Sequence, residues 1–280
     1  MLCWYNGNFV DEKELFISPF DHGYLHGIGF YERFRTYNGQ VLLLEERFNR
    51  LCDVLNNFRI PMPFTISDIQ HVVERLWIST SREDGIICLN ILAGEADYLK
   101  APKNPNVIIY RRSLIQRARG TEKNGVWLKT THNSTEHSAR YKSHYFGNNI
   151  LASFEVQNIE KTEGFLLNTR GHIAEGITSN IFWVRDGILY TPSLSTGINP
   201  GVTRQWVIHT AKRFGYRVVE EIFFPQELLN AFECFVTNSI DELVPISNIG
   251  RTKFLGEEGP IYKRLHQAYI EEIIQIMKRG

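Results

Sequence analysis

The sequence predicts a two-domain protein, with an α+β domain at the N-terminus followed by an α/β domain. The chain has 280 residues, enough for two modest domains that each bury a core. Segments with strand-like and helix-like apolar spacing alternate along its length. Residues 111–124 are rich in charge and poor in large apolar side chains, as is typical of a linker. We therefore expect domains at 1–112 and 125–280, joined by a linker at 113–124.

The composition is that of an ordinary soluble globular protein, with 43% hydrophobic and 22% charged residues. The 31 basic residues equal the 31 acidic residues, so we expect no general attraction to nucleic acid or to a membrane surface. Four scattered cysteines show no metal-ligand spacing, which favours reduced thiols and no metal site. A turn at Asn6-Gly7 arrives before any apolar run, unlike a signal peptide, and cytoplasmic localisation is expected.

The first domain is predicted to consist of two hairpins, two further strands and two helices. Asn6-Gly7 and Asn38-Gly39 are strong signals for hairpin turns. Ser67 is expected to cap the second helix, which would end at residue 75 or 79. The expected strands are residues 2–5, 8–10, 28–37, 40–44, 85–93 and 106–110, and the first expected helix is residues 45–57.

The second domain is predicted to mix strands with three helices. Asp186-Gly187 marks a hairpin turn, and an apolar stripe over residues 261–277 indicates a helix that packs on the core. The expected strands are residues 126–131, 164–168, 181–184, 188–190, 216–221 and 234–237, and the other expected helices are residues 146–159 and 202–214.

One amine and one carboxylate, 33 residues apart, suggest chemistry on a phosphorylated aldehyde cofactor. Lys142 precedes Ser143, and Glu175 precedes a turn that contains Gly176, Thr178 and Ser179. An amine can form an imine with an aldehyde, and a carboxylate can keep a ring nitrogen protonated. Small hydroxyl side chains and backbone amides can hold a phosphate.

Eight segments in the same order make the chain resemble a class IV aminotransferase, the pyridoxal 5'-phosphate family that includes branched-chain aminotransferase, D-amino-acid transaminase and aminodeoxychorismate lyase. The segments are residues 4–7, 27–32, 46–51, 142–143, 175–182, 186–192, 200–204 and 235–245. The resemblance implies the two-domain D-amino-acid-aminotransferase-like fold (fold type IV of this cofactor class), with the cofactor in the interdomain cleft, bound by the C-terminal domain. It also implies a homodimer that acts on small amine and keto-acid substrates.

The resemblance assigns roles to six residues around the cofactor. Lys142 matches the Schiff-base lysine, which also moves the proton, and Glu175 matches the carboxylate that faces the ring nitrogen. Arg50 matches a phosphate-binding arginine on a helix. The phosphate site is completed by Val202 and Thr203, which open a helix after Pro200-Gly201, and by the hydroxyl residue Ser239.

The substrate side departs from the patterns of the family. Tyr31, Arg33 and Arg35 alternate along one strand and should share a face, where the arginines suit a substrate carboxylate. The strand at 85–93 has Cys88 and Asn90 where branched-chain enzymes carry tyrosine and arginine. The arginine–histidine pair of D-amino-acid transaminases and the arginine- and glycine-rich loop of the lyases are also missing.

The sequence therefore leaves several functions open. Transamination of an amino acid or related primary amine is the leading hypothesis. Elimination of pyruvate, as in aminodeoxychorismate lyase, is the alternative. Cofactor binding without turnover and a plain interaction module are the remaining hypotheses.

Overall fold

The computed structural model describes residues 1–97, 100–114, 120–135 and 140–278. The chain divides into two compact units. The first contains Met1–Gln116, Lys142–Tyr145 and Glu272–Gly280, and the second contains Arg117–Tyr141 and Phe146–Glu271. Of the expected linker, residues 115–119 lie outside the described residues, and residues 123 and 124 already belong to a strand.

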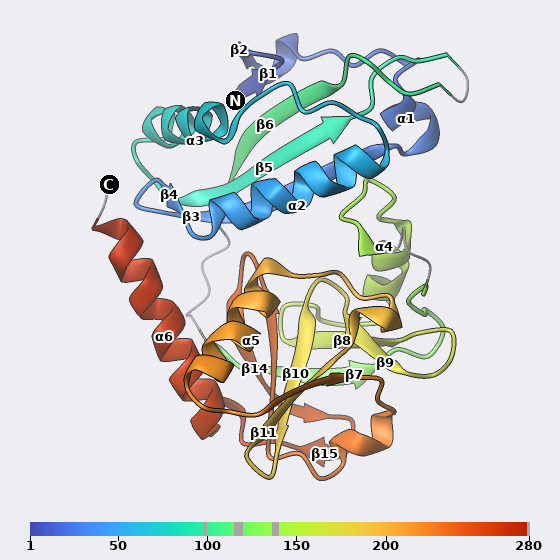
Figure 1. Cartoon of the computed structure of the whole chain (residues 1–280), viewed down its shortest axis with the longest axis vertical. Helices are drawn as coiled ribbons and strands as arrows, with labels where there is room; N and C mark the ends of the chain where they lie inside the picture. The colour runs from blue at the N-terminus through green and yellow to red at the C-terminus, as the bar shows by residue number, and fades with distance from the viewer. Residues whose placement is uncertain (98–99, 115–119, 136–139, 279–280) are drawn as a thin grey trace. The chain divides into compact units, whose positions relative to one another are not determined.

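A six-stranded antiparallel sheet forms the centre of the first unit (Figure 1). Its strand order is β2-β1-β6-β5-β3-β4. The strands are β1 (Leu2–Tyr5), β2 (Asn8–Asp11), β3 (Gly29–Tyr37), β4 (Gln40–Val41), β5 (Gly85–Leu92) and β6 (Asn106–Ser113). The helices are α1 (His22–His26), α2 (Leu44–Asn57) and α3 (Ile66–Ser79). This is the α+β arrangement that the sequence predicts.

The register of the sheet separates two faces. On one face, Glu32 lies opposite Leu89, Leu89 opposite Ile109, and Ile109 opposite Trp4. This face is the core side, because all four residues are buried and α2 and α3 pack against β3, β1 and β6. Successive residues of a strand point to opposite faces, so the neighbours of these residues form the second face.

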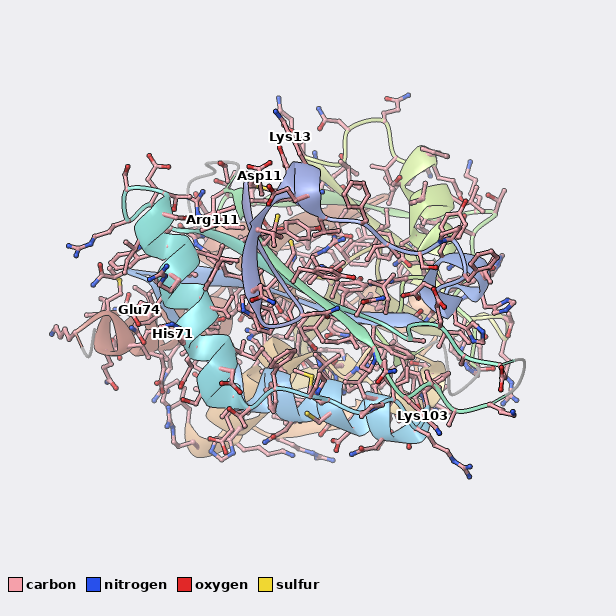
Figure 2. The ribbon with its side chains drawn as sticks, turned by 90° about the horizontal axis from the view of Figure 1, so that it is seen from above. Asp11, Lys13, His71, Glu74, Lys103 and Arg111 are labelled. Atoms are coloured by element: carbon pink, nitrogen blue, oxygen red, sulfur yellow. The ribbon has the colours of Figure 1, made fainter. Side chains whose placement is uncertain are left out.

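Helix α3 begins earlier than the sequence predicts. Thr65, not Ser67, is its N-cap: the Thr65 hydroxyl accepts from the Asp68 amide, and the Asp68 carboxylate accepts from the Thr65 amide. This reciprocal pair satisfies two amides that would otherwise lack partners, so the helix starts before Ser67. Figure 2 labels His71 and Glu74 on α3, and both are exposed because the buried stripe lies on the opposite side of the helix.

The second unit is built on a mixed sheet in the order β12-β11-β10-β13-β14-β7-β8-β9, with β15 paired to β14. Three of its strand pairs are parallel: β11 with β12, β14 with β7, and β7 with β8. The strands are β7 (Lys123–Trp127), β8 (Thr162–Leu167), β9 (Ile173–Gly176), β10 (Asn180–Arg185), β11 (Ile188–Pro192), β12 (Val218–Glu221), β13 (Glu233–Asn238), β14 (Glu242–Ile249) and β15 (Thr252–Lys253). The helices are α4 (Gly147–Phe154), α5 (Val202–Arg213) and α6 (Pro260–Met277).

Two expected elements of the second unit are shorter or shifted. Helix α4 ends at Phe154 instead of residue 159, and β7 ends at Trp127 instead of residue 131. Both differences involve Glu155, the residue that follows α4. Its carboxylate accepts from the backbone amides of residues 129–131, the segment that follows β7. This carboxylate holds the segment after β7 as a loop.

Three strands were missed by the sequence analysis: β9, β14 and β15. Strand β14 contains Pro245 opposite Phe235, and proline disfavours a strand assignment because it cannot donate to the ladder. Within the described ranges, none of the helices combines the length and apolarity that a membrane span requires.

Candidate active site

Lys142 lies at an edge of the sheet in the first unit. Strand β4 covers the end of β3, where it pairs with Thr36 and Tyr37. The start of β3 pairs at the same edge with the segment Lys142–Tyr145. The Tyr31 amide donates to the Lys142 carbonyl at 2.9 Å, and the His144 amide donates to the Gly29 carbonyl at 2.8 Å. A Cβ at Gly29 would overlap the His144 ring, so this edge needs glycine. These backbone contacts explain why Lys142 belongs to the first unit.

The Lys142 amine has a strongly perturbed proton affinity. Its Nζ lies 5.8 Å from the centroid of the Tyr31 ring. The residue is half-buried, and desolvation of the amine lowers its pKa to about 8. The negative charge of Glu32 opposes this shift, whereas the positive charges of Arg50, Arg47 and Arg33 add to it. A lysine with this pKa has a substantial neutral fraction near pH 7, as a nucleophile requires.

Arg50, expected at the cofactor phosphate, forms a two-point ion pair with Glu32. Arg50 Nε donates to one Glu32 oxygen at 2.9 Å, and Nη2 donates to the other at 2.8 Å. Glu32 is 2% exposed, so its charge would be costly to bury without this guanidinium. The pair places Arg50 on the core face of β3 and within electrostatic range of Lys142.

The expected substrate residues lie on the other face of β3. The Arg33 guanidinium is 4.8 Å from the Tyr31 ring centroid, and the Arg35 guanidinium is 5.3 Å from that of Tyr37. His144 stacks on Tyr31 with ring centroids 6.2 Å apart. Burial, together with the positive charge of Arg33, lowers the pKa of His144. Tyr31 therefore lies among Lys142, Arg33 and His144.

Glu175, near the end of β9 in the second unit, is fixed by two nitrogen donors. Its Oε2 accepts from the Asn180 side chain at 3.2 Å and from the Asn199 amide at 3.0 Å. The Asn180 side chain also donates to the Asn199 carbonyl at 2.9 Å, which orients the amide group. The carboxylate is half-buried, and these hydrogen bonds orient one of its oxygens.

A second glutamate supports the turn that follows Glu175. Glu163 Oε1 accepts from the Ile177 amide at 2.9 Å, and a Cβ on Gly176 would come within 2.8 Å of that oxygen. Burial raises the pKa of Glu163 to about 7, although Lys123, 3.9 Å away, acts in the opposite direction. The turn therefore packs directly on a buried carboxyl group.

The N-terminus of α5 has the features of an anion site. Within the described residues, no side chain caps its first turn after Gly201. The Thr203 hydroxyl donates to the Asn238 carbonyl at 3.3 Å, next to Ser239 in the chain. Arg204 is buried and donates to the Pro192 carbonyl and to Glu220. Burial lowers the pKa of Arg204, an effect partly offset by the charges of Glu220 and Glu175.

Each unit, taken by itself, contains donors that suit part of a phosphorylated aldehyde cofactor. The first unit contains an amine of lowered pKa at Lys142. The second unit contains a carboxylate held by hydrogen bonds at Glu175 and a helix N-terminus without a side-chain cap at Val202 and Thr203. An aldehyde, a ring nitrogen and a phosphate are the groups that such donors bind.

Sequence reasoning named the segments that contain Asn180 and Arg204 but gave these residues no role, and it passed over Glu163. Asn180 lies in the segment 175–182 and Arg204 in the segment 200–204, both of which resemble the family, and this position was a signal that each has a role in the site. The contacts of Glu163 depend on the pairing of β8 with β9, which no local pattern reveals.

The chain belongs to the class IV aminotransferase family, because the model of the family described as amino-transferase class IV matches residues 29–249. It is 35% identical to aminodeoxychorismate lyase of Bacillus subtilis over 277 residues, which cover 97% of this chain and 94% of the relative. It is 28% identical to D-alanine aminotransferase of Bacillus licheniformis over 278 residues, which cover 98% of each protein.

Solved structures confirm the fold. The branched-chain amino acid aminotransferase of Escherichia coli has a TM-score of 0.86 at 24% identity and covers 96% of this chain and 93% of its own. The branched-chain enzyme from T.th., solved with N-(5'-phosphopyridoxyl)-L-glutamate, has a TM-score of 0.85 at 24% identity. The match covers 97% of this chain and 93% of that enzyme's chain. At these identities the likeness is evidence for the fold alone.

Proposed function

We propose that the protein binds pyridoxal 5'-phosphate through Lys142 and acts on a primary amine. The observation that carries this proposal is the environment of Lys142. With a pKa of about 8, roughly one amine in ten is neutral at pH 7 and can attack an aldehyde. Family membership and the matching position of Lys142 support the same cofactor.

In this proposal Lys142 and Glu175 act on the same bound cofactor, which supplies an electron sink. Lys142 moves a proton to and from the substrate carbon that bears the nitrogen. Glu175, held by Asn180 and Asn199, keeps positive charge on the ring nitrogen. Arg50, Val202, Thr203 and Ser239 hold the phosphate, and Tyr31, Arg33 and Arg35 contact the substrate.

The reaction that we favour is the elimination of pyruvate, the alternative that the sequence left open, because the Bacillus subtilis relative is named aminodeoxychorismate lyase. The 35% identity of this relative over nearly the whole chain supports elimination over transamination, the leading hypothesis from the sequence. Transamination remains the second candidate, supported by the full-length match to D-alanine aminotransferase.

The test begins with the visible absorption spectrum of the purified protein, before and after addition of pyridoxal 5'-phosphate. A cofactor band that is absent in Lys142→Ala and retained in Lys129→Ala, an exposed lysine, is the expected result. No band with added cofactor would overturn the proposal.

The reaction is tested by incubating the loaded protein with aminodeoxychorismate without any keto acid. Release of pyruvate is expected. Conversely, amino-group transfer that requires a keto acid, without pyruvate release from aminodeoxychorismate, would replace the lyase assignment by transamination.

We also propose a homodimer in the cytoplasm. Large apolar side chains of α4 are exposed in the single chain, with Ile150 at 47%, Leu151 at 60% and Phe154 at 77%. Such a patch is typical of a surface that another chain covers. Light scattering after size-exclusion chromatography tests this, and a monomer at micromolar concentration would contradict it.

A further inference from the structure

Arg204 is a buried arginine that directly follows Val202 and Thr203 at the start of α5. Its Nη2 donates to the Pro192 carbonyl at 2.9 Å and to Glu220 Oε2 at 3.0 Å. Among the described residues, its Nε and Nη1 are buried without a hydrogen-bond partner. The position of the guanidinium therefore depends on two contacts, one at the end of β11 and one on β12.

The start of α5 also packs against the side chain that supports Glu175. A Cβ at Gly201, the residue before α5, would overlap Asn180 Oδ1 and would lie 3.4 Å from Arg204 Cβ. The other end of the same amide group, Asn180 Nδ2, donates to Glu175 Oε2 at 3.2 Å. The Asn180 side chain therefore connects the Glu175 carboxylate to the start of the helix.

The strand that holds Arg204 is joined to the strand that begins at Asn180. The Thr191 hydroxyl, one residue before Pro192, donates to the Ile181 carbonyl at 2.8 Å. Ile181 follows Asn180 at the start of β10. Through Pro192, Arg204 thus connects the helix to the strands that hold Asn180 in place.

The charges around Arg204 reach from Glu175 to the surface. Burial lowers the pKa of Arg204, and the charges of Glu220 and Glu175 raise it, so Glu175 lies within electrostatic range of the guanidinium. Glu220 lies at the surface, with 35% of its side chain exposed. Its other oxygen is 3.6 Å from Nζ of the exposed Lys212. A substitution at Glu220 can therefore change the contacts of Arg204 without altering the core.

We propose that Arg204 is a positioning residue that fixes the spacing between the phosphate site at Val202 and Thr203 and the carboxylate of Glu175. The inference rests on the proposed function, because it needs a ligand that reaches both groups. A rigid ligand with a phosphate and a ring nitrogen binds both groups at once only when their spacing matches its own. Since the second contact is then intramolecular, the gain in affinity from joining the two parts depends on that spacing.

The test divides the ligand into its two parts and measures each by isothermal titration calorimetry with the full chain freed of cofactor. Inorganic phosphate probes the start of the helix, and pyridoxine probes the contacts of the ring. Pyridoxine 5'-phosphate carries both parts and lacks the aldehyde that Lys142 could attack. Arg204→Gln is expected to bind pyridoxine 5'-phosphate about tenfold more weakly than the parent protein, with the affinities for phosphate and pyridoxine changed less than about twofold.

Two results would overturn the proposal. Unchanged affinity of Arg204→Gln for pyridoxine 5'-phosphate would show that Arg204 does not set the spacing. An equal loss of affinity for inorganic phosphate alone would show that Arg204 is a phosphate ligand and not a positioning residue.

Glu220→Gln tests the same contact from the surface, and it decides the question if Arg204→Gln fails to fold. It removes the negative charge that pairs with Arg204, so a loss of about threefold is expected for pyridoxine 5'-phosphate alone. The matched control is Glu221→Gln, an exposed carboxylate that points to the other face of the same strand. Equal affinities of the two variants for pyridoxine 5'-phosphate would contradict the assignment.

Calorimetry separates this inference from the proposed function, because none of the three probes needs an imine or turnover. A cofactor band that depends on Lys142, with unchanged binding of pyridoxine 5'-phosphate in Arg204→Gln, would support the function and overturn the inference. A selective loss of pyridoxine 5'-phosphate binding in Arg204→Gln, in a protein without a cofactor band, would support the inference and overturn the proposed function.

Discussion

Lys142 and Glu175 are both half-buried, but their surroundings control them in different ways. Burial lowers the pKa of Lys142, and the surrounding charges modify this shift, because Glu32 raises the pKa and three arginines lower it further. Glu175 is surrounded by hydrogen-bond donors, with Asn180 and the Asn199 amide on one oxygen. The first environment sets a proton affinity, whereas the second fixes a position. Substitutions of the neighbouring charged residues should therefore act on the amine, and substitutions of the neighbouring donors should act on the position of the carboxylate.

The largest effect is expected from Glu175→Gln. Glutamine can still accept from Asn180 and Asn199, so the position is kept while the charge is lost. If the charge of Glu175 stabilises the ring nitrogen, kcat should fall by about 10²–10³, as for other preorganised electrostatic groups. Steady-state kinetics of the loaded enzyme measure this change.

The control for that experiment is Glu221→Gln, an exposed carboxylate on β12. It should keep the kcat of the parent protein. A Glu175→Gln enzyme with nearly full kcat would show that the placement of this group matters and that its negative charge does not, which would contradict the prediction.

The next effect concerns the buried carboxyl below the Glu175 turn. The pKa of Glu163 is raised from 4.5 to about 7, mainly by burial. A raised carboxyl pKa gives stability that is complete below about pH 4.5 and is lost as pH rises through 7. The loss amounts to about 3 kcal/mol, at about 1.4 kcal/mol per pH unit. Glu163→Gln should remove this pH dependence from the free energy of unfolding.

Urea unfolding at pH 5 and pH 8 measures the change, with Glu160→Gln, an exposed neighbour in sequence, as the control. The parent protein and Glu160→Gln should lose stability between the two pH values by an amount that Glu163→Gln does not. Equal pH slopes in all three proteins would show that Glu163 is ionised in the fold across this range.

A smaller effect is expected from the ion pair beside Lys142. Glu32→Gln removes the negative charge that raises the pKa of Lys142, so that pKa should fall below about 8. The neutral fraction of the amine at pH 7 should then rise about threefold to fivefold. The rate of cofactor uptake by apoprotein, measured against pH, should shift its midpoint to lower pH.

Glu83→Gln is the control, since Glu83 is an exposed partner of Arg111 in the same unit. It should leave the midpoint unchanged. A shift to higher pH in Glu32→Gln would contradict this prediction, because it would mean that the substitution hydrates the amine and that this change outweighs the loss of the negative charge.

The sequence predicted most of this fold, because the strands and helices follow clear apolar periods. Its errors have local causes: Thr65 caps α3 through a reciprocal pair with Asp68, and Pro245 obscures β14. The candidate site was predicted less completely. Lys142 and Glu175 lie in recognisable motifs, whereas Glu163 gains its surroundings from strand register. Register depends on pairing between distant segments, which a single sequence does not specify.

An effect of similar size is expected from Asn180→Ala, which tests the geometric half of the comparison. The change removes one donor to Glu175 and leaves the Asn199 amide in place, so the carboxylate keeps its charge but loses part of its support. One hydrogen bond of this kind contributes about 1 kcal/mol, which corresponds to roughly a fivefold fall in kcat.

Asn180→Asp separates position from charge at the same site. Aspartate cannot donate as asparagine does, and it brings a second negative charge to within about 3 Å of Glu175, the distance that the asparagine nitrogen now spans. Kinetics of the two variants should therefore show a larger loss for aspartate than for alanine. Equal losses would mean that the donor alone matters, whereas no loss in either would show that the Asn199 amide suffices to hold Glu175. A larger loss for aspartate would show that the charge balance next to Glu175 matters in addition to the hydrogen bond that Asn180 donates.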